Sequence, residues 1–494
     1  MNPTLQKWGI SLLLVVVSWL LFGTAQDHTR LGPPESELIW DNPAVAEGEV
    51  LPILQGRWQA GEYRPQVRPL ATAFRAGEHA LFGYDRGGYQ QIQVLLHGVA
   101  AILVFFLLLR WLASPFLAAL GGLLFVVHPA ATHSVLYLGG LSEILATILF
   151  LGALLALTTY DERNRGAGLL FPLALGAMLT KETGFLLPLV ALGILVADRS
   201  RPLSIARRFR PVGLALLAAI LYRILVIVTT TEAYRRIPAV DPTSGEPHLS
   251  LLLEGLGGIA VQGSLVFLPL RLSHDHSWLL LLEGAERVAY VAAGVLLSAF
   301  LLFVAYRRGG ERARTGLALL AILPLLAPAL APWIDGSLGS ERHLYLALPG
   351  FIGLLLLLGR AIARRWPARR SMLVGIGVGI VLLFGVKSSD RVDEFASIDT
   401  LLAADRETYP ENPQIHFEIG NRYMRGGDFE SAVQAYRRAL ALHPRFALAG
   451  VNLGVAYIAL EEWGLALRAL DPAARLSKHV RSLRLVDARA HYHA

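Results

Sequence analysis

The chain has 494 residues, of which 54% are hydrophobic, and its mean hydropathy is +0.49. This composition excludes an ordinary soluble enzyme and predicts a protein that crosses a membrane several times. The formal charge of +7 does not indicate a nucleic-acid partner, because the basic residues fall in short clusters between apolar runs, as the positive-inside rule describes. The absence of cysteine excludes disulfides, thiolate catalysis and cysteine-ligated metal.

Eleven apolar runs are predicted to cross the membrane. The first follows Lys7 and is interpreted as a retained span, because no small-residue cleavage site follows it. With the arginine clusters placed in the cytoplasm, the amino terminus is inside and everything after Val386 is outside. The predicted runs are residues 9–22, 92–109, 116–127, 144–157, 169–179, 185–196, 212–228, 288–304, 317–330, 344–358 and 373–386.

The predicted membrane domain, residues 1–390, contains two segments that are not counted as simple crossings. Residues 24–89 form a long outer loop of mixed charge. Residues 249–270 are apolar, but counting them as a crossing would put the arginines at 307–314 outside. Their glycines and flanking prolines favour a re-entrant or interfacial helix, which membrane proteins tolerate where protein or water covers the backbone.

The tail, residues 391–494, repeats with a period of 34. Small and aromatic residues recur at this spacing, for example Gly420 with Gly454 and Tyr423 with Tyr457. This pattern is typical of tetratricopeptide repeats, in which small residues let paired helices approach closely. The repeats are predicted at about 413–446 and 447–480, so the fold class is all-α: a membrane helix bundle followed by a short α-solenoid. Its expected ligand is a protein partner.

Under this topology, an unusual set of polar residues lies in outer loops or at the outer ends of spans. Charges in such places are costly and by default mark a function or a partner. We therefore expect one outward-facing polar cavity. Its candidate residues are Asp41, Arg68, His128, His133, Glu143, Lys181, Glu182, Asp275, Glu341 and Arg342.

These residue types suit sugar transfer from a polyprenyl-phosphate carrier. The reaction needs a carboxylate to take the proton of an acceptor hydroxyl and cations to hold the departing phosphate. Asp41 is the candidate base. Arg342, Arg68 and Lys181 are candidate phosphate partners, because arginine binds phosphate through two hydrogen bonds and lysine acts as a point charge. The donor is the only cosubstrate expected; the carboxylates would permit a divalent metal, but nothing indicates one.

Each candidate also has a structural interpretation. Asp41 fits an Asx turn before Pro43, and His128 fits a helix cap before Pro129. The other interpretations are pairs or clusters: His133 with Glu143 as a hydrogen-bonded pair, Lys181 with Glu182 as an adjacent ion pair, Asp335 and Glu341 with Arg342 as a rim salt bridge, and His274, Asp275 and His276 as a solvated loop rather than a metal cluster.

The order of these motifs resembles the transmembrane and tetratricopeptide-repeat O-mannosyltransferases, which belong to the GT-C superfamily of polyprenyl-phosphate-sugar-dependent glycosyltransferases. The resemblance runs nearly end to end. Its motifs are Ile39-Trp40-Asp41-Asn42; Arg68-Pro69-Leu70 with Phe74-Arg75 and Ala80-Leu81-Phe82-Gly83; Gln93 to His97; His128-Pro129 through Tyr137, Gly140 and Glu143; Thr180-Lys181-Glu182-Thr183 with Pro188; Leu272-Ser273 with Asp275; and Glu341-Arg342-His343-Leu344-Tyr345-Leu346.

The resemblance implies a hexosyltransferase that moves a sugar, mannose in the family, to a protein or glycan hydroxyl by inverting displacement. It implies a site in the bacterial periplasm on an inner-membrane protein, adds Tyr345 to the donor-binding residues, and makes Asn42 and Asp275 an acceptor or metal loop. This chain departs from the family pattern at four positions: Asn42 replaces an aspartate, His133 a glutamate, Leu141 an arginine and Val67 a tyrosine.

Two other functions remain open at this point. A non-catalytic membrane scaffold, whose repeats recruit envelope proteins, fits the altered motif positions. A lipid-carrier transporter would show internal pseudo-symmetry, and no inverted repeat is visible in the sequence.

Overall fold

The structure is a computed structural model that describes residues 3–29, 35, 39–48, 68–159, 166–197, 205–229, 248–274, 276, 284–306, 312–330 and 340–476. All regular elements in these ranges are helical, which confirms the predicted all-α fold. Asp275, one of the candidate site residues, lies outside the described ranges, as do Asp335 and the tail beyond residue 476.

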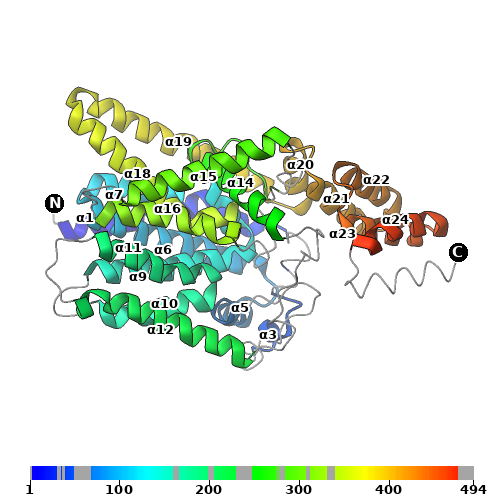
Figure 1. The fold of residues 1–494 in the computed structure, drawn as a ribbon, viewed down its shortest axis with the longest axis horizontal. Helices are drawn as coiled ribbons and strands as arrows, with labels where there is room; N and C mark the ends of the chain where they lie inside the picture. The colour runs from blue at the N-terminus through cyan, green and yellow to red at the C-terminus, as the bar shows by residue number, and fades with distance from the viewer. Residues whose placement is uncertain are drawn as a thin grey trace.

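Long helices form a bundle that precedes the repeats (Figure 1). These helices are α1 Pro3–Phe22, α6 Arg86–Leu112, α7 Pro115–Val126, α9 Leu141–Thr159, α10 Ala167–Thr180, α11 Leu187–Ala197, α12 Ile205–Thr229, α14 His248–Phe267, α15 Gly284–Tyr306, α16 Arg312–Leu330, α18 Leu344–Arg365 and α19 Arg370–Glu394. Shorter helical pieces connect them: η1 Gly23–Asp27, α3 Pro43–Ala46, α5 Pro69–Phe82, η2 Pro129–Ala131, α8 Thr132–Leu136, η3 Leu138–Gly140, η4 Glu182–Leu186, η6 Glu341–His343 and η7 Pro367–Arg369.

Seven described helices are long and apolar enough to cross a membrane, or eight if the bent pair of α7 with the following η2 and α8 is one span. Three more predicted spans coincide with shorter apolar helices, at Gly168–Thr180, Glu182–Ala197 and Ala313–Leu326. Every predicted run therefore falls on a helix. The total of eleven crossings remains a prediction.

The segment predicted as the outer loop between the first two spans, residues 24–89, is partly helical. It contains η1, α3 and the 14-residue α5, and α6 already begins at Arg86. The side chain of Asp85 accepts a hydrogen bond from the Gly87 backbone N–H at 3.0 Å, which satisfies an otherwise unpaired amide in the first turn. Short helices are compatible with a connection between two spans, so the assignment of this segment to the outer side remains a prediction.

The apolar segment 249–270 is the helix α14. Gly294 of α15 lies so close that an added Cβ would be 1.8 Å from the Leu256 carbonyl oxygen, which shows close packing between α14 and α15. Within this helix, Gly255–Phe267 is an apolar stretch. Whether this helix is re-entrant or interfacial remains a prediction.

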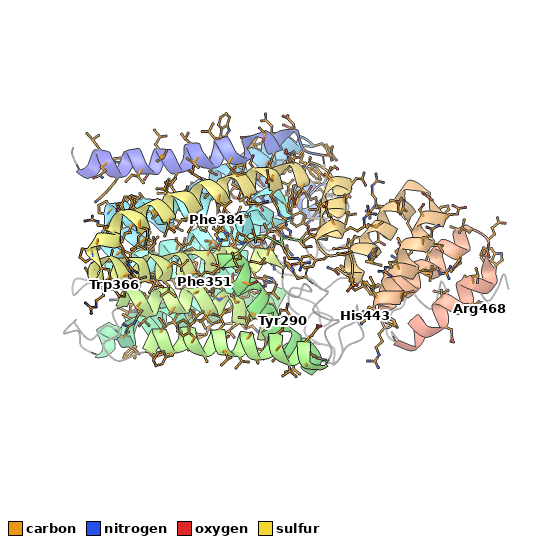
Figure 2. All side chains as sticks on the ribbon, turned by 90° about the horizontal axis from the view of Figure 1, so that it is seen from above. Tyr290, Phe351, Trp366, Phe384, His443 and Arg468 are labelled. Atoms are coloured by element: carbon orange, nitrogen blue, oxygen red, sulfur yellow. The ribbon has the colours of Figure 1, made fainter. Side chains whose placement is uncertain are left out.

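The bundle has two dissimilar ends. In Figure 1, α3, α5 and the repeats lie toward one end, whereas the amino terminus and the turn between α18 and α19 lie toward the other. Figure 2 shows Trp366, in that turn, at the end opposite the repeats. The helices α3 and α5, which belong to the predicted outer loop, thus lie toward the same end of the molecule as the repeats.

The tail forms two antiparallel helix pairs after the linking helix α20, Ile398–Thr408. The pairs are α21 Pro413–Gly426 with α22 Phe429–Leu442, and α23 Ala447–Ala459 with α24 Trp463–Leu476. These helices begin at the predicted starts of the two repeats. The recurring glycines lie where the helices of a pair touch, Gly420 against the Tyr436 ring and Gly454 against Leu470.

Substituting Gly420 by Ala is expected to destabilise the repeats by about 1–3 kcal/mol, because a Cβ there would lie 2.5 Å from the Tyr436 ring. The matched control is Gly426→Ala in the same helix, where an added Cβ would lie 3.8 Å from the flexible Arg422 side chain and the gain in helix propensity favours stability. Limited proteolysis of the full chain during heating should cut Gly420→Ala at a lower temperature than wild type, and Gly426→Ala no earlier.

Candidate functional site

The site is built around a buried corner, residues 134–138, where α8 ends and the chain turns into η3 and α9. A bend of this kind leaves carbonyl groups without helical partners, and buried carbonyls must find donors elsewhere. Side chains of α5 and α6 supply them. Gln93 donates to the carbonyls of Ser134 and Tyr137, Gln90 to Val135, Arg86 to Leu136 and Arg75 to Leu138. The corner is therefore rigidly held.

Glu35 is the buried acid that balances this set of donors. Its side chain is fully buried, accepts the Leu138 backbone N–H at 2.9 Å and faces Arg86 at 3.3 Å. Arg75 is neutralised by Glu78 at 2.7 Å. Sequence reasoning missed these roles, because Glu35 appeared there as one of many acids in a mixed-charge loop.

Asp41 lies in an exposed turn beside this corner. The preceding residues Ile39 and Trp40 form a small apolar cluster with Tyr89 and Leu138, and the Trp40 indole N–H donates to the Gly83 carbonyl at 3.2 Å. The aromatic pair of Trp40 and Tyr89 is edge-to-face, with centroids 5.6 Å apart. Ile39 and Trp40 therefore fix the turn on the corner, while the Asp41 side chain remains exposed to solvent.

The Asx turn proposed for this segment belongs to Asn42 rather than to Asp41. The Asn42 Oδ1 accepts the Ala44 backbone N–H at 3.1 Å, and Asn42 is 2% exposed. Among the described residues, none forms a hydrogen bond or ion pair with the Asp41 carboxylate. Asn42 thus shapes the turn, and Asp41 is left available.

Five predicted site residues form two buried ion-pair systems joined through Ser142. Lys181 Nζ lies 2.6 Å from Glu143, and Glu143 also accepts the Ser142 hydroxyl at 2.8 Å. Arg68 forms a bidentate pair with Glu182, at 2.9 and 3.3 Å, and donates to the Ser142 hydroxyl at 3.2 Å. Arg342 approaches Glu143 at 3.8 Å. The structure therefore brings Arg68, Glu143, Lys181, Glu182 and Arg342 together.

Three of the alternative pairings were wrong. Lys181 and Glu182 do not pair with each other: each bonds across the bundle, to Glu143 and Arg68 respectively. The partner of Glu143 is Lys181, not His133, and Glu341 pairs with Arg391 at 3.1 Å rather than with Arg342. Neighbours in sequence point in different directions here, because Lys181 ends α10 in an extended conformation just before η4.

Arg342 and His133 flank the Tyr137 ring. The Arg342 guanidinium carbon is 5.7 Å from the ring centroid, and the His133 ring centroid is 5.8 Å away. Arg342 keeps 18% of its side chain exposed, whereas His133 is 6% exposed and its Nδ1 has no hydrogen-bond partner among the described residues. Arg342 is therefore the most accessible cation of the cluster beside the corner.

The other predicted site residues lie deeper or elsewhere. His128 caps η2, with Nδ1 accepting the Ala130 backbone N–H at 3.2 Å and Nε2 3.1 Å from the Val266 carbonyl oxygen, so the helix-cap interpretation is confirmed. Tyr345 is fully buried, and its hydroxyl lies 2.7 Å from the His97 Nδ1, tying α18 to α6. Glu341 is fully buried as well.

His274 and His276 are engaged, so the solvated interpretation was wrong for these two histidines; Asp275 lies outside the described residues. His274 pairs with Asp405, and His276 lies 3.5 Å from Glu341. Within the described ranges, no group of three or more histidine or acidic side chains is placed to hold a metal ion.

Comparisons with known proteins agree with the motifs. A family model for the TPR repeat matches residues 420–460. Mouse "Protein O-mannosyl-transferase TMTC4" is 27% identical over 425 residues, which are 75% of this chain and 57% of the mouse protein. Drosophila "Protein O-mannosyl-transferase Tmtc1" is 31% identical over 147 residues, 29% of this chain and 16% of that protein. The chain thus spans little more than half the length of the first of these relatives.

Among solved structures, the oligosaccharyltransferase of Archaeoglobus fulgidus tethered to an acceptor peptide aligns with 86% of this chain and 58% of its own, at 12% identity and a TM-score of 0.41. The enzyme AglB of the same organism, in complex with an inhibitory peptide and a dolichol-phosphate, covers 81% of this chain and 56% of its own, at 12% identity and a TM-score of 0.40. The predicted resemblance is confirmed by the sequence relatives: over three quarters of its length the chain is similar to a protein O-mannosyl-transferase, and its tail carries the tetratricopeptide repeat.

Proposed function

We propose that this protein is an integral membrane glycosyltransferase of the GT-C type. It moves a sugar from a polyprenyl-phosphate carrier to a hydroxyl of a protein or glycan acceptor, on the side of the membrane where the repeats lie. The names of its relatives favour mannose as the sugar. We place the protein in a bacterial inner membrane, with this side facing the periplasm.

One observation carries the proposal: the exposed acid and the accessible cation flank the same rigid corner. The turn with Asp41 packs through Ile39 and Trp40 on Leu138. Arg342 lies over the ring of Tyr137, the residue before it. A general base must reach the acceptor hydroxyl and a cation must reach the leaving phosphate, and both groups lie next to one anomeric carbon. The packing of the Asp41 turn on Leu138 and of Arg342 on the neighbouring Tyr137 suits this arrangement.

In the reaction, the acceptor hydroxyl gives its proton to the Asp41 carboxylate as its oxygen attacks the anomeric carbon. The new bond forms on the face opposite the phosphate, which inverts the configuration. The bond between the anomeric carbon and the phosphate oxygen breaks, and the lipid phosphate leaves with the electron pair. Arg342 stabilises the charge that develops on that phosphate, because it is preorganised by Tyr137 and Glu143.

The test is transfer of labelled sugar to endogenous acceptors in membranes that contain the protein. The donors are a panel of polyprenyl-phosphate sugars and, as a control, the matching nucleotide sugars. Transfer from a polyprenyl-phosphate donor that falls at least about tenfold in Arg342→Met supports the proposal, since the lost contact is a charge-assisted one. Transfer from nucleotide sugars with equal efficiency would contradict it.

A second function, a non-catalytic scaffold, is favoured by one specific observation. Glu143, Glu182, Arg68 and Lys181 already pair with one another, so the cluster resembles a structural core as much as a binding site. Correctly inserted protein that transfers no sugar from any donor, while its repeats still retain an envelope protein, would support this function.

A further inference from the structure

The loop at residues 271–276 is held between the candidate site and the first helix of the tail. On the bundle side, Glu341 is fully buried and accepts the Ser273 backbone N–H at 2.6 Å through Oε1. Its Oε2 accepts from Arg391, at the end of α19, at 3.1 Å. Arg391 is itself 3% exposed and pairs with Glu394 at 2.7 Å.

On the tail side, α20 holds the same loop. Asp405 is fully buried and accepts from both the backbone N–H and the ring of His274. Burial opposes ionisation of Asp405, yet His274 and Arg391 beside it hold the pKa of that carboxyl below its ordinary value, so it stays charged near neutral pH. Breaking a buried charged pair of this kind is costly.

Arg271 and Tyr409 close the contact at the end of α20. The Arg271 guanidinium donates to the Thr408 carbonyl at 3.0 Å and lies over the Tyr409 ring at 5.0 Å. In return, the Tyr409 hydroxyl donates to the Arg271 carbonyl at 2.9 Å. The loop and α20 thus share three separate attachments, at His274, Arg271 and Tyr409.

This junction reaches the candidate site itself. Arg391 lies over the Phe395 ring at 5.3 Å, and the Phe395 and His133 rings are 5.7 Å apart. His133 in turn flanks Tyr137, beneath Arg342. Glu341 is also the residue directly before Arg342. A continuous set of packed and charged side chains therefore joins α20 to the accessible cation.

We propose that Arg391 and Asp405 are positioning residues, which lock the repeats onto the bundle as one rigid unit and hold Arg342 in place. The repeats are then a fixed part of the site rather than a tethered arm. A second step rests on the proposed function. If the repeats bind one segment of an acceptor protein, the sugar is added at a fixed distance along the acceptor from that segment.

The rigidity can be measured directly, because the chain has no cysteine. Spin labels at Leu81→Cys on α5 and Glu430→Cys on α22, both exposed, report the distance between bundle and repeats by pulsed electron paramagnetic resonance. Wild type should give one narrow distance distribution. Asp405→Asn and Arg391→Met should each broaden it at least about twofold, because domains without strong contacts move relative to one another.

The matched control is Asp399→Asn, also on α20, which breaks an exposed ion pair with Arg422 and should leave the distribution narrow. A second label pair within the repeats, Glu430→Cys with Leu465→Cys, separates loss of rigidity from unfolding and should stay narrow in every variant. A distribution in Asp405→Asn and Arg391→Met as narrow as that of wild type would overturn the proposal.

The fixed distance between the bound segment and the modified residue can be tested separately. Mass spectrometry of labelled acceptor should find one dominant position in wild type and scattered positions in Asp405→Asn, with turnover reduced less than selectivity. An unchanged position would overturn this step. If wild type transfers no sugar, the proposed function fails, while the distance measurement still decides whether the junction is rigid.

Discussion

Replacing Asp41 by Asn is expected to lower sugar transfer by about 10²–10⁴-fold, the range that a positioned general base contributes. The change removes the proton acceptor but keeps the size and hydrogen-bonding reach of the side chain. Because the side chain is exposed and the turn is held by Ile39, Trp40 and Asn42, folding and membrane insertion should be unaffected. Initial rates with saturating donor, normalised to inserted protein, provide the measurement.

The matched control is Asp27→Asn, another exposed aspartate in the same polar segment, at the end of η1. Its transfer rate should match that of wild type. If Asp41→Asn kept the wild-type rate, Asp41 would not be the base, although a glycosyltransferase with a different base would still be compatible with the fold.

The second large effect concerns stability. Glu143→Ala and Lys181→Met are each expected to reduce the free energy of unfolding by about 3–5 kcal/mol, because each removes the nearest opposite charge from a buried charged group. The two side chains are 3–4% exposed and 2.6 Å apart. The double variant should cost clearly less than the sum of the single ones, since neither charge then remains to be buried. Unfolding in mixed micelles, followed by tryptophan fluorescence, measures these differences.

Lys387→Met is the matched control for Lys181→Met. Lys387 pairs with Asp390 at 3.7 Å on the exposed surface of α19, with side chains 45% and 58% exposed, so its loss should cost less than about 1 kcal/mol. If the two lysine variants lost the same free energy of unfolding, the Lys181 pair would be well solvated, which would contradict the burial seen in the structure.

The sequence was most informative where the signal is local and periodic. Each predicted apolar run coincides with a helix, because length and hydropathy are properties of a continuous segment. The repeats begin at residues 413 and 447 as predicted, since the period of 34 marks the glycines that let paired helices touch.

The sequence was least informative where partners come from distant segments. Glu35 looked like a loop acid but forms the buried centre of the corner. The adjacent Lys181 and Glu182 looked like a pair, yet their partners lie 38 and 114 residues away. The contact between Arg391 and Glu341 spans 50 residues and joins two regions that were assigned separate roles.

By itself, then, the sequence determined the membrane bundle, the repeats and the identities of most charged residues that meet beside the corner. Only the tertiary structure decided which charges pair, that Asp41 stays exposed while Asn42 is buried, and that α20 of the tail contacts Arg271 and His274. The physical reason is that hydropathy and helix period act over a few turns of one segment. The partner of a buried charge is instead chosen by whichever helices pack around it, and that choice depends on the whole chain.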